Sequence, residues 1–247
     1  MTDWVKFRNT HLQASWLFPL VIDDRSFDAI LAGRPREARG VIQQILERTL
    51  WFWPRVVDAT AWATGQPGKP QTPENYKEID AHALLLLDWV KRVCPDGDAP
   101  IADIGCNCGR HIIELASAGY RNLTGVDAMG SALAMFEARA PTVFAQAKIH
   151  HDLFQRFLMR QPDRHFDTIY SHGSTIELVH PSFDVVAHMG RITRGHICLI
   201  LTEGEYFRRD WLGQFARRGF LPIHIERVTN PENGSNLVVL RRASTAR

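Results

Sequence analysis

The sequence predicts an α/β protein built on a doubly wound parallel sheet, and three observations lead to that fold. From about residue 72 onward, short apolar runs of strand length alternate with longer amphipathic segments. One such stretch, residues 101–127, is a strand, a glycine-bearing turn, a helix and a second strand, which make a right-handed βαβ unit. The chain of 247 residues is 45% hydrophobic, enough to bury a substantial core in one domain with an extension, or in two small domains.

The βαβ unit carries the main binding signal of the chain. A buried strand over residues 101–104 runs into the turn at residues 105–109, and the following amphipathic helix ends at Gly119, where a C-cap glycine would sit. The second strand ends on Asp127. Glycines in the turn let the backbone approach a ligand, and the helix behind it directs unpaired N–H groups there. Asp127 lies where the acidic residue of a nucleotide-binding unit accepts hydrogen bonds from a ribose.

The composition of the turn indicates which nucleotide is bound. An NAD fingerprint needs three glycines, whereas this turn has Asn107 in the middle place and Arg110 in the third. A NAD(P) oxidoreductase is therefore disfavoured. The segment instead resembles motif I of the class I S-adenosylmethionine (SAM)-dependent methyltransferases. Asp103, Gly105 and Gly109 match that motif, with Asn107 replacing its middle glycine.

The resemblance covers residues 72–247 and implies a mostly parallel seven-stranded sheet with an antiparallel last strand. It also implies SAM as the cofactor and S-adenosylhomocysteine as the product. Asp127 would bind the ribose, Asp152 the adenine amino group, and Tyr76 the methionine portion. The full set of residues expected at the cofactor is Tyr76, Asp103, Gly105, Cys106, Asn107, Gly109, Asp127, Ala128, Asp152, Leu153 and Ser171.

The remaining elements follow in chain order. Strands and helices are expected to alternate, with a closing pair of strands joined by a turn rich in Asn, Pro and Gly. Helices are expected over residues 76–93, 131–140 (with Ser131 as N-cap), 183–191 and 211–218, and strands over 142–148, 166–170, 196–201, 220–228 and 236–242.

The loop after the strand at 166–170 is the expected place of catalysis. Ligands of open α/β sheets bind at the carboxyl ends of the strands. His172, Glu177 and His180 are titratable groups in this loop, and an imidazole can take a proton from a hydroxyl or amine nucleophile. Each of the three is also compatible with a purely structural role. His172, Glu203 and Tyr206 are the expected contacts of the acceptor.

Residues 1–71 form the expected helical extension. An apolar helical face is expected over 36–50, with shorter helical pieces at 26–31 and 56–64. Tryptophans are concentrated in this part of the chain, at Trp4, Trp16, Trp51, Trp53 and Trp62. Such a cluster is typical of a core, and the alternative is a lid over the acceptor pocket.

Charge and cysteine content restrict the partners. The net charge is +2, from 29 basic and 27 acidic residues spread along the chain, so nucleic acid is not favoured. Cys106 and Cys108 have no second Cys/His pair at zinc spacing, so no metal site is expected. The sequence shows neither a long apolar run nor a signal peptide, and we expect a cytoplasmic protein without membrane association. The sequence leaves open whether the protein forms a homodimer.

Together these features predict a SAM-dependent methyltransferase that acts on a small molecule, at an oxygen, nitrogen or carbon atom. Two alternatives remain. One is an RNA or protein methyltransferase, which needs a basic or peptide-sized groove. The other is a non-catalytic SAM-binding regulatory subunit, which the replacement of the middle glycine by Asn107 would fit.

Overall fold

The computed structural model describes residues 24–32, 45, 49, 72–179, 183–202, 209–228 and 234–244. The strands are β1 (Ile101–Ile104), β2 (Leu123–Asp127), β3 (Lys148–His151), β4 (Phe166–His172), β5 (Thr193–Thr202), β6 (Phe220–Val228) and β7 (Ser235–Arg242). The helices are α3 (Asp24–Leu31), α6 (Ala81–Val93), α7 (Arg110–Ser117), α8 (Gly130–Arg139), α9 (Pro141–Gln146), α10 (Phe154–Arg160), α11 (Val185–Ile192) and α12 (Trp211–Arg217), with the 3₁₀ helices η2 (Pro73–Tyr76) and η3 (Gly173–Leu178).

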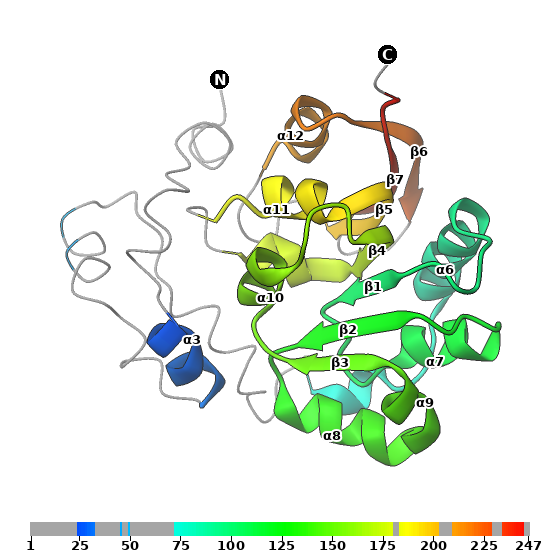
Figure 1. Ribbon diagram of the computed structural model, residues 1–247, viewed down its shortest axis with the longest axis vertical. Coiled ribbons are helices and arrows are strands. Elements are labelled where there is room, and N and C mark those ends of the chain that lie inside the picture. Colours follow the sequence, from blue (N-terminus) through cyan, green and yellow to red (C-terminus); the bar gives the residue numbers. More distant parts are fainter. Residues whose placement is uncertain are drawn as a thin grey trace.

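The strands form one seven-stranded sheet in the order β3-β2-β1-β4-β5-β7-β6 (Figure 1). Strands β1 to β5 pair in parallel, whereas β7 runs antiparallel to both β5 and β6. The predicted doubly wound sheet with an antiparallel last strand is confirmed.

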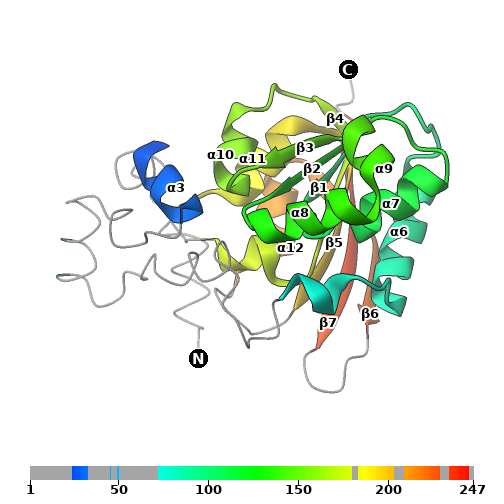
Figure 2. The same cartoon turned by 90° about the horizontal axis from the view of Figure 1, so that it is seen from below.

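Helices cover both faces of the sheet (Figures 1 and 2). One apolar cluster joins α6, α7 and α8 to Ile101 of β1, and the other joins α10, α11 and α12 to Ala102 and Ile104 of the same strand. Successive residues of β1 thus point into opposite cores, as a parallel sheet buried on both faces requires.

The order of the strands fixes where a ligand can bind. From β1 the chain winds outward through β2 and β3, then returns to place β4 on the other side of β1. The carboxyl ends of β1 and β4 therefore diverge into loops on opposite faces, which opens a crevice at this topological switch point.

Two local predictions were wrong. Residues 142–148 are not a strand, because Pro141 starts the short helix α9 and the strand β3 begins only at Lys148. Proline is favourable at the first position of a helix as well as after its end, so its position alone is ambiguous. The helix expected over residues 76–93 begins later, at Ala81, where the Asp80 side chain accepts a hydrogen bond from the Ala83 N–H.

A smaller correction concerns α8, which begins at Gly130 with Met129 as N-cap. Ser131 therefore lies inside the helix and does not cap it.

Helix α3 is the described helical part of the extension and confirms the piece expected at 26–31. It packs through Ala29 on the core formed by α10 to α12, and Asp28 accepts a hydrogen bond of 2.7 Å from Arg156 of α10. The expected helices over 56–64 and nearly all of 36–50, and the five tryptophans, lie outside the described residues. Within the described ranges, no helix has the length and apolarity needed to cross a bilayer.

Gly109 and Gly119 allow a test of how closely α7 and α8 pack. Both have positive φ (73° and 92°), but a Cβ on Gly109 would lie 2.4 Å from the Phe136 ring, whereas a Cβ on Gly119 would meet nothing within 4 Å. We expect Gly119→Ala to lower the free energy of unfolding by about 1 kcal/mol, the cost of the left-handed backbone. Gly109→Ala should cost a further 1–3 kcal/mol or so, because the extra atom overpacks a buried site.

Urea unfolding of the two variants and the parent protein measures both the cost of the left-handed backbone and the cost of the contact with Phe136. Equal losses in the two variants would show that the contact with Phe136 relaxes without cost.

Candidate functional site

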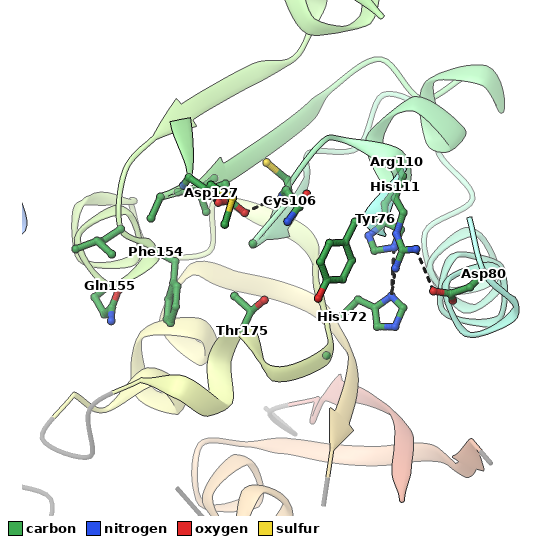
Figure 3. Close-up of a pocket in the computed structure, with 17 residues that line it drawn as sticks. Tyr76, Asp80, Cys106, Arg110, His111, Asp127, Phe154, Gln155, His172 and Thr175 are labelled. Carbon is green, nitrogen blue, oxygen red and sulfur yellow. Dashed lines mark hydrogen bonds and ion pairs between the residues drawn. The ribbon is translucent and has the colours of Figure 1, made fainter. Parts of the chain in front are cut away.

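A cavity of about 240 Å³ lies at the carboxyl edge of the sheet. It is bounded by the turn after β1, the end of β2, the start of α10 and the segment from the end of β4 into η3 (Figure 3). Asp127 and Phe154 lie toward one side of it, and Tyr76, Arg110, His172 and Asp80 toward the other (Figure 3). The cavity therefore spans the switch point.

Most of the residues expected at a cofactor line this cavity. They come from the segment before α6, the turn after β1, the end of β2 and the start of α10: Tyr76, Gly105, Cys106, Asn107, Asp127, Ala128 and Leu153.

The turn after β1 depends on three residues with left-handed backbone. Gly105, Asn107 and Gly109 have φ of 84°, 47° and 73°. Asparagine is among the few residues that adopt this region readily. The Asn107 side chain also accepts a hydrogen bond of 2.7 Å from the Cys108 N–H. Asn107 therefore preserves the shape of the turn in place of the missing glycine.

Gly105 has a second reason to lack a side chain. A Cβ at this position would lie 2.4 Å from the Thr175 side chain, which η3 brings across the switch point. The turn after β1 and the segment after β4 are thus packed directly against each other, and together they close one side of the cavity.

Asp127 joins the turns after β1 and β2. Its Oδ2 accepts a hydrogen bond from the Asn107 N–H and its Oδ1 accepts one from the Met129 N–H, both at 2.8 Å. Burial raises the pKa of this carboxyl, and the two N–H groups oppose that shift. A carboxylate has about four acceptor positions, so Asp127 keeps acceptor capacity for hydroxyl groups in the cavity.

The other expected cofactor residues do not line the cavity. Gly109 packs on Phe136, and the Ser171 hydroxyl donates a hydrogen bond of 2.7 Å to the Ile104 carbonyl, which ties β4 to β1. Asp152 accepts hydrogen bonds from the Leu153 N–H and from Arg156, each at 2.7 Å. It therefore holds the start of α10 from behind the cavity wall.

Asp103 also lies behind the cavity. Its side chain is 1% exposed, and its Oδ2 lies 3.4 Å from His111 Nδ1. The structure therefore places this carboxylate where it acts on a ligand only through other residues.

The expected catalytic and acceptor-binding residues differ in their position relative to the cavity. His172 lines the cavity, whereas Glu177 is buried in η3 and does not. His180, Glu203 and Tyr206 lie outside the described residues.

Several cavity residues were not predicted from the sequence. The most polar of them are Asp80, Arg110 and His111. Arg110 and His111 begin the helix after the turn, a position from which side chains can reach the ligand side of the sheet. Asp80 carries only the signature of a helix N-cap, which gives no indication of a site.

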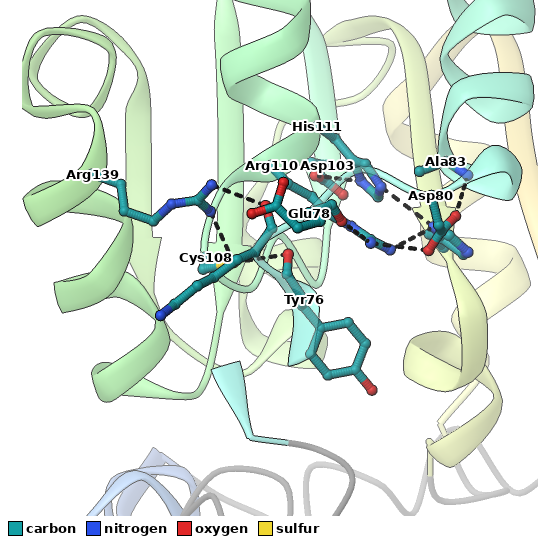
Figure 4. Close-up of polar contacts among 11 residues, drawn as sticks. Tyr76, Glu78, Asp80, Ala83, Asp103, Cys108, Arg110, His111 and Arg139 are labelled. Atoms are coloured by element: carbon teal, nitrogen blue, oxygen red, sulfur yellow. Dashed lines mark hydrogen bonds and ion pairs between the residues drawn. The ribbon is translucent and has the colours of Figure 1, made fainter. Parts of the chain in front are cut away.

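Arg110 ties the segment before α6 to the turn. Its guanidinium donates to the Glu78 carbonyl at 2.7 Å and to Asp80 at 3.0 Å, and it lies 5.8 Å from the centre of the Tyr76 ring (Figure 4). The Cys108 thiol donates to the Tyr76 carbonyl at 3.1 Å. These contacts hold Tyr76 over the cavity and give Cys108 a structural role.

His172 is surrounded by groups that disfavour its charged form. Its Nδ1 lies 3.3 Å from both His111 Nε2 and Arg110 Nη2. Burial, followed by electrostatic repulsion from the neighbouring His111, lowers the pKa of His172 to about 3. The imidazole is therefore neutral at physiological pH.

Among the described residues, one cluster has the geometry to approach a metal ion. Asp80, His82 and His172 offer ligand atoms within 4.8 Å of one another. The Arg110 guanidinium, however, binds Asp80 and lies against His172 Nδ1. A metal ion would have to displace this fixed positive charge, so the residues present do not suit one.

Comparisons with known proteins find one family match. Residues 101–195 match the family described as "Methyltransferase domain". No curated protein sequence matches the chain.

Solved structures share the fold at low sequence identity. The geranyl diphosphate C-methyltransferase from Streptomyces coelicolor A3(2), in complex with Mg²⁺, geranyl diphosphate and S-adenosylhomocysteine, is 14% identical with a TM-score of 0.55, over 73% of this chain and 89% of that one. The magnesium protoporphyrin IX methyltransferase from Synechocystis PCC 6803, with bound SAM, is 17% identical with a TM-score of 0.51, over 82% and 96%. The [4+2]-cyclase SpnF is 15% identical with a TM-score of 0.54, over 64% and 80%.

Residues 101–195 are therefore a methyltransferase domain, set in the seven-stranded fold described above. The match supports the resemblance of the sequence to the class I SAM-dependent methyltransferases.

The neutral state of His172 predicts a particular pH dependence of stability. The pKa is about 3 in the folded protein, against about 6.5 in an unfolded chain. Between these pH values the unfolded chain binds more protons than the folded protein does. The contribution of His172 to the free energy of unfolding is therefore complete above about pH 6.5 and is lost as the pH falls toward 3. His172→Gln should therefore reduce the loss of stability between pH 7 and pH 5 by up to about 2 kcal/mol.

Urea unfolding at the two pH values tests this expectation. His165→Gln, at the opposite edge of the sheet, controls for the substitution itself. An unchanged pH dependence in His172→Gln would show that the native imidazole is not held neutral.

Proposed function

We propose that this methyltransferase transfers a methyl group from SAM to a small-molecule acceptor bound beside His172. The observation that carries the proposal is the shared cavity. The turn after β1 and Asp127 bound it on one side of the switch point, and His172 bounds it on the other. Two ligands bound there would lie side by side, the arrangement a direct displacement needs.

The chain's own residues suit SAM. Asp127 has acceptor positions left for the ribose hydroxyls, and Leu153 and Phe154 present apolar surface beyond it for the adenine. We assign the turn from Gly105 to Asn107, with Tyr76 above it, to the methionine portion. When bound, the cofactor supplies an electrophilic methyl group, and the protein's task is to hold the acceptor in line with it.

His172 is the residue we assign to the acceptor. Its Nδ1 faces His111 and Arg110, which leaves Nε2 as the other polar atom of the ring. A neutral imidazole can bind the proton of an acceptor hydroxyl or amine at this atom. His180, Glu203 and Tyr206 stay predictions, and the buried Glu177 would act only through neighbouring residues.

Size and charge favour a small acceptor. The cavity is about 240 Å³, and the chain carries a net charge of only +2. At the polar end of the cavity, Arg110 is already paired with Asp80. A nucleic acid would instead call for clustered, unpaired basic side chains. The two similar methyltransferases named above act, by their descriptions, on geranyl diphosphate and magnesium protoporphyrin IX, which are small molecules.

Asp127→Asn should weaken the binding of S-adenosylhomocysteine at least tenfold. The amide oxygen can accept only one of the two N–H groups that Asp127 holds, and the negative charge facing the ribose is lost. Calorimetric titration measures the affinity, and circular dichroism checks the fold.

The matched control is Asp98→Asn, which alters an exposed carboxylate paired with Arg121. Unchanged affinity in Asp127→Asn would remove Asp127 from the cofactor site.

The reaction itself is tested with SAM labelled in its methyl group. The purified protein is incubated with pooled small metabolites, total RNA or total protein from the source cells, and each fraction is assayed for label. We expect transfer to the metabolite fraction and no transfer by Asp127→Asn. Label in RNA or protein would favour the macromolecular alternative, and tight binding of S-adenosylhomocysteine without any transfer would favour the non-catalytic subunit.

A further inference from the structure

We propose that His111 and Asp103 form a buried proton relay behind His172, so that a proton taken from the acceptor is finally held by His111. The inference deepens the proposed function and rests on it for the identity of the reaction. It assigns positioning roles to His111 and Asp103, whose relay atoms touch neither SAM nor the acceptor.

The first step of the relay is the contact between the two imidazoles. His111 Nε2 and His172 Nδ1 are 3.3 Å apart. The ring centroids are 5.3 Å apart and the planes are inclined by 18°. Because the two nitrogens approach much more closely than the ring centres while the planes stay nearly parallel, the rings meet edge to edge. That arrangement suits a proton shared between the two nitrogens.

The second step is the contact of His111 with Asp103. His111 Nδ1 lies 3.4 Å from Asp103 Oδ2, and the two side chains are 6% and 1% exposed. In the described part of the chain, neither Asp103 oxygen has a hydrogen bond within normal limits. A buried carboxylate is costly unless a positive charge or several donors compensate it. His111 is placed to donate its Nδ1–H to this carboxylate and to bring a positive charge against it once a proton reaches Nε2.

The sheet register brings these groups together. Asp103 of β1 pairs with Tyr170 of β4, and His172 follows two residues later on the same face as Tyr170. That face is covered by α7, where His111 lies. Burial, with the negative charge of Asp103 adding to it, raises the pKa of Tyr170 well above its ordinary value, so its phenol stays neutral beside the relay.

The two neighbours of His172 Nδ1 favour different tautomers. A guanidinium can only donate, so the 3.3 Å contact of Arg110 Nη2 favours an unprotonated Nδ1. That contact is longer than the two hydrogen bonds that Arg110 Nη1 donates, to the Glu78 carbonyl at 2.7 Å and to Asp80 at 3.0 Å. If His111 directs its Nδ1–H to Asp103, its Nε2 is an acceptor. His172 then carries its proton on Nδ1, donates it to His111, and presents an unprotonated Nε2 for the acceptor.

The step balances as follows. The bond between the sulfonium sulfur and the methyl carbon breaks, with its electrons kept by sulfur, as the acceptor atom forms its bond to that carbon. The acceptor's proton passes to His172 Nε2, and the Nδ1 proton of His172 passes to His111 Nε2. The positive charge lost from sulfur thus ends on His111 against Asp103, and solvent removes the proton after product release.

The surrounding charges favour this direction. Arg110 lies against His172 and opposes a lasting positive charge there, whereas Asp103 lies against His111 and stabilises one. The titratable and charged groups around the two imidazoles are Asp80 and His82 from α6, Asp103 from β1, Arg110 from α7 and Tyr170 from β4. Among these, Asp103 is the carboxylate that touches His111.

Nitrogen NMR of protein with ¹⁵N-labelled histidine tests the relay without any acceptor. His172→Gln identifies the His172 signals. We expect His172 in the parent protein, free and with S-adenosylhomocysteine, to be protonated on Nδ1. In His111→Gln, Arg110 becomes its strongest partner, and the proton should move to Nε2. A parent protein with the proton on His172 Nε2 would overturn the relay even if methyl transfer is confirmed.

Turnover of the acceptor found by the labelling assay gives the second readout. In His111→Gln and in Asp103→Asn, kcat at pH 7 should fall at least tenfold and should rise with pH between 7 and 9, where the parent enzyme is level. Affinity for S-adenosylhomocysteine should stay within about threefold in Asp103→Asn. His165→Gln, which alters an imidazole immediately before β4 and away from the cavity, should keep the parent profile. A uniform loss at every pH would assign His111 a structural role only.

Discussion

The site depends on one carboxylate that holds two turns together. Asp127 accepts one N–H from the turn after β1 and one from the turn after β2. These turns leave neighbouring strands, and the N–H groups of Gly105 and Cys106 also donate to the Val126 carbonyl at 2.9 and 3.0 Å. The left-handed backbone at Gly105, Asn107 and Gly109 gives the first turn its shape, while Asp127 sets its position. The close contact of Gly105 with Thr175 then extends this arrangement across the switch point to η3.

Much of the fold could be predicted because its signals are local. The apolar run at residues 101–104, the stop at Gly119 and the end of β2 at Asp127 are each encoded within a few residues. The error at 142–148 is local too: Pro141 fits both the end of one helix and the first position of the next. Only the tertiary packing of α9 beside α8 decides between these possibilities.

The polar end of the cavity could not be predicted in the same way, because it is assembled from distant segments. Asp80, Arg110 and His172 come from three elements, and their pairing depends on the position of α6 relative to α7 and β4. The placement of His172 and His111 on one face of the sheet could have been predicted from the sequence. The alternation of β4 places His172 on the same face as Tyr170, and that face is covered by α7, where His111 is the second residue. What the sequence could not give is the burial that makes His172 neutral.

Charge along this end of the cavity alternates in a way that matters for chemistry. Asp80 compensates Arg110 near the surface, and Asp103 faces His111 in the interior. His172 lies between these two pairs, and Asp80, the carboxylate that acts on it, is paired with Arg110. A lone histidine with a pKa of about 3 is a poor final destination for a proton, since the ideal base titrates near the working pH. The same histidine can pass a proton on when a second imidazole, itself in contact with a carboxylate, lies next to it. In the proposed relay, the low pKa of His172 and the pair behind it are two parts of one arrangement, in which His172 stays neutral and the charge is held by His111 against the buried Asp103.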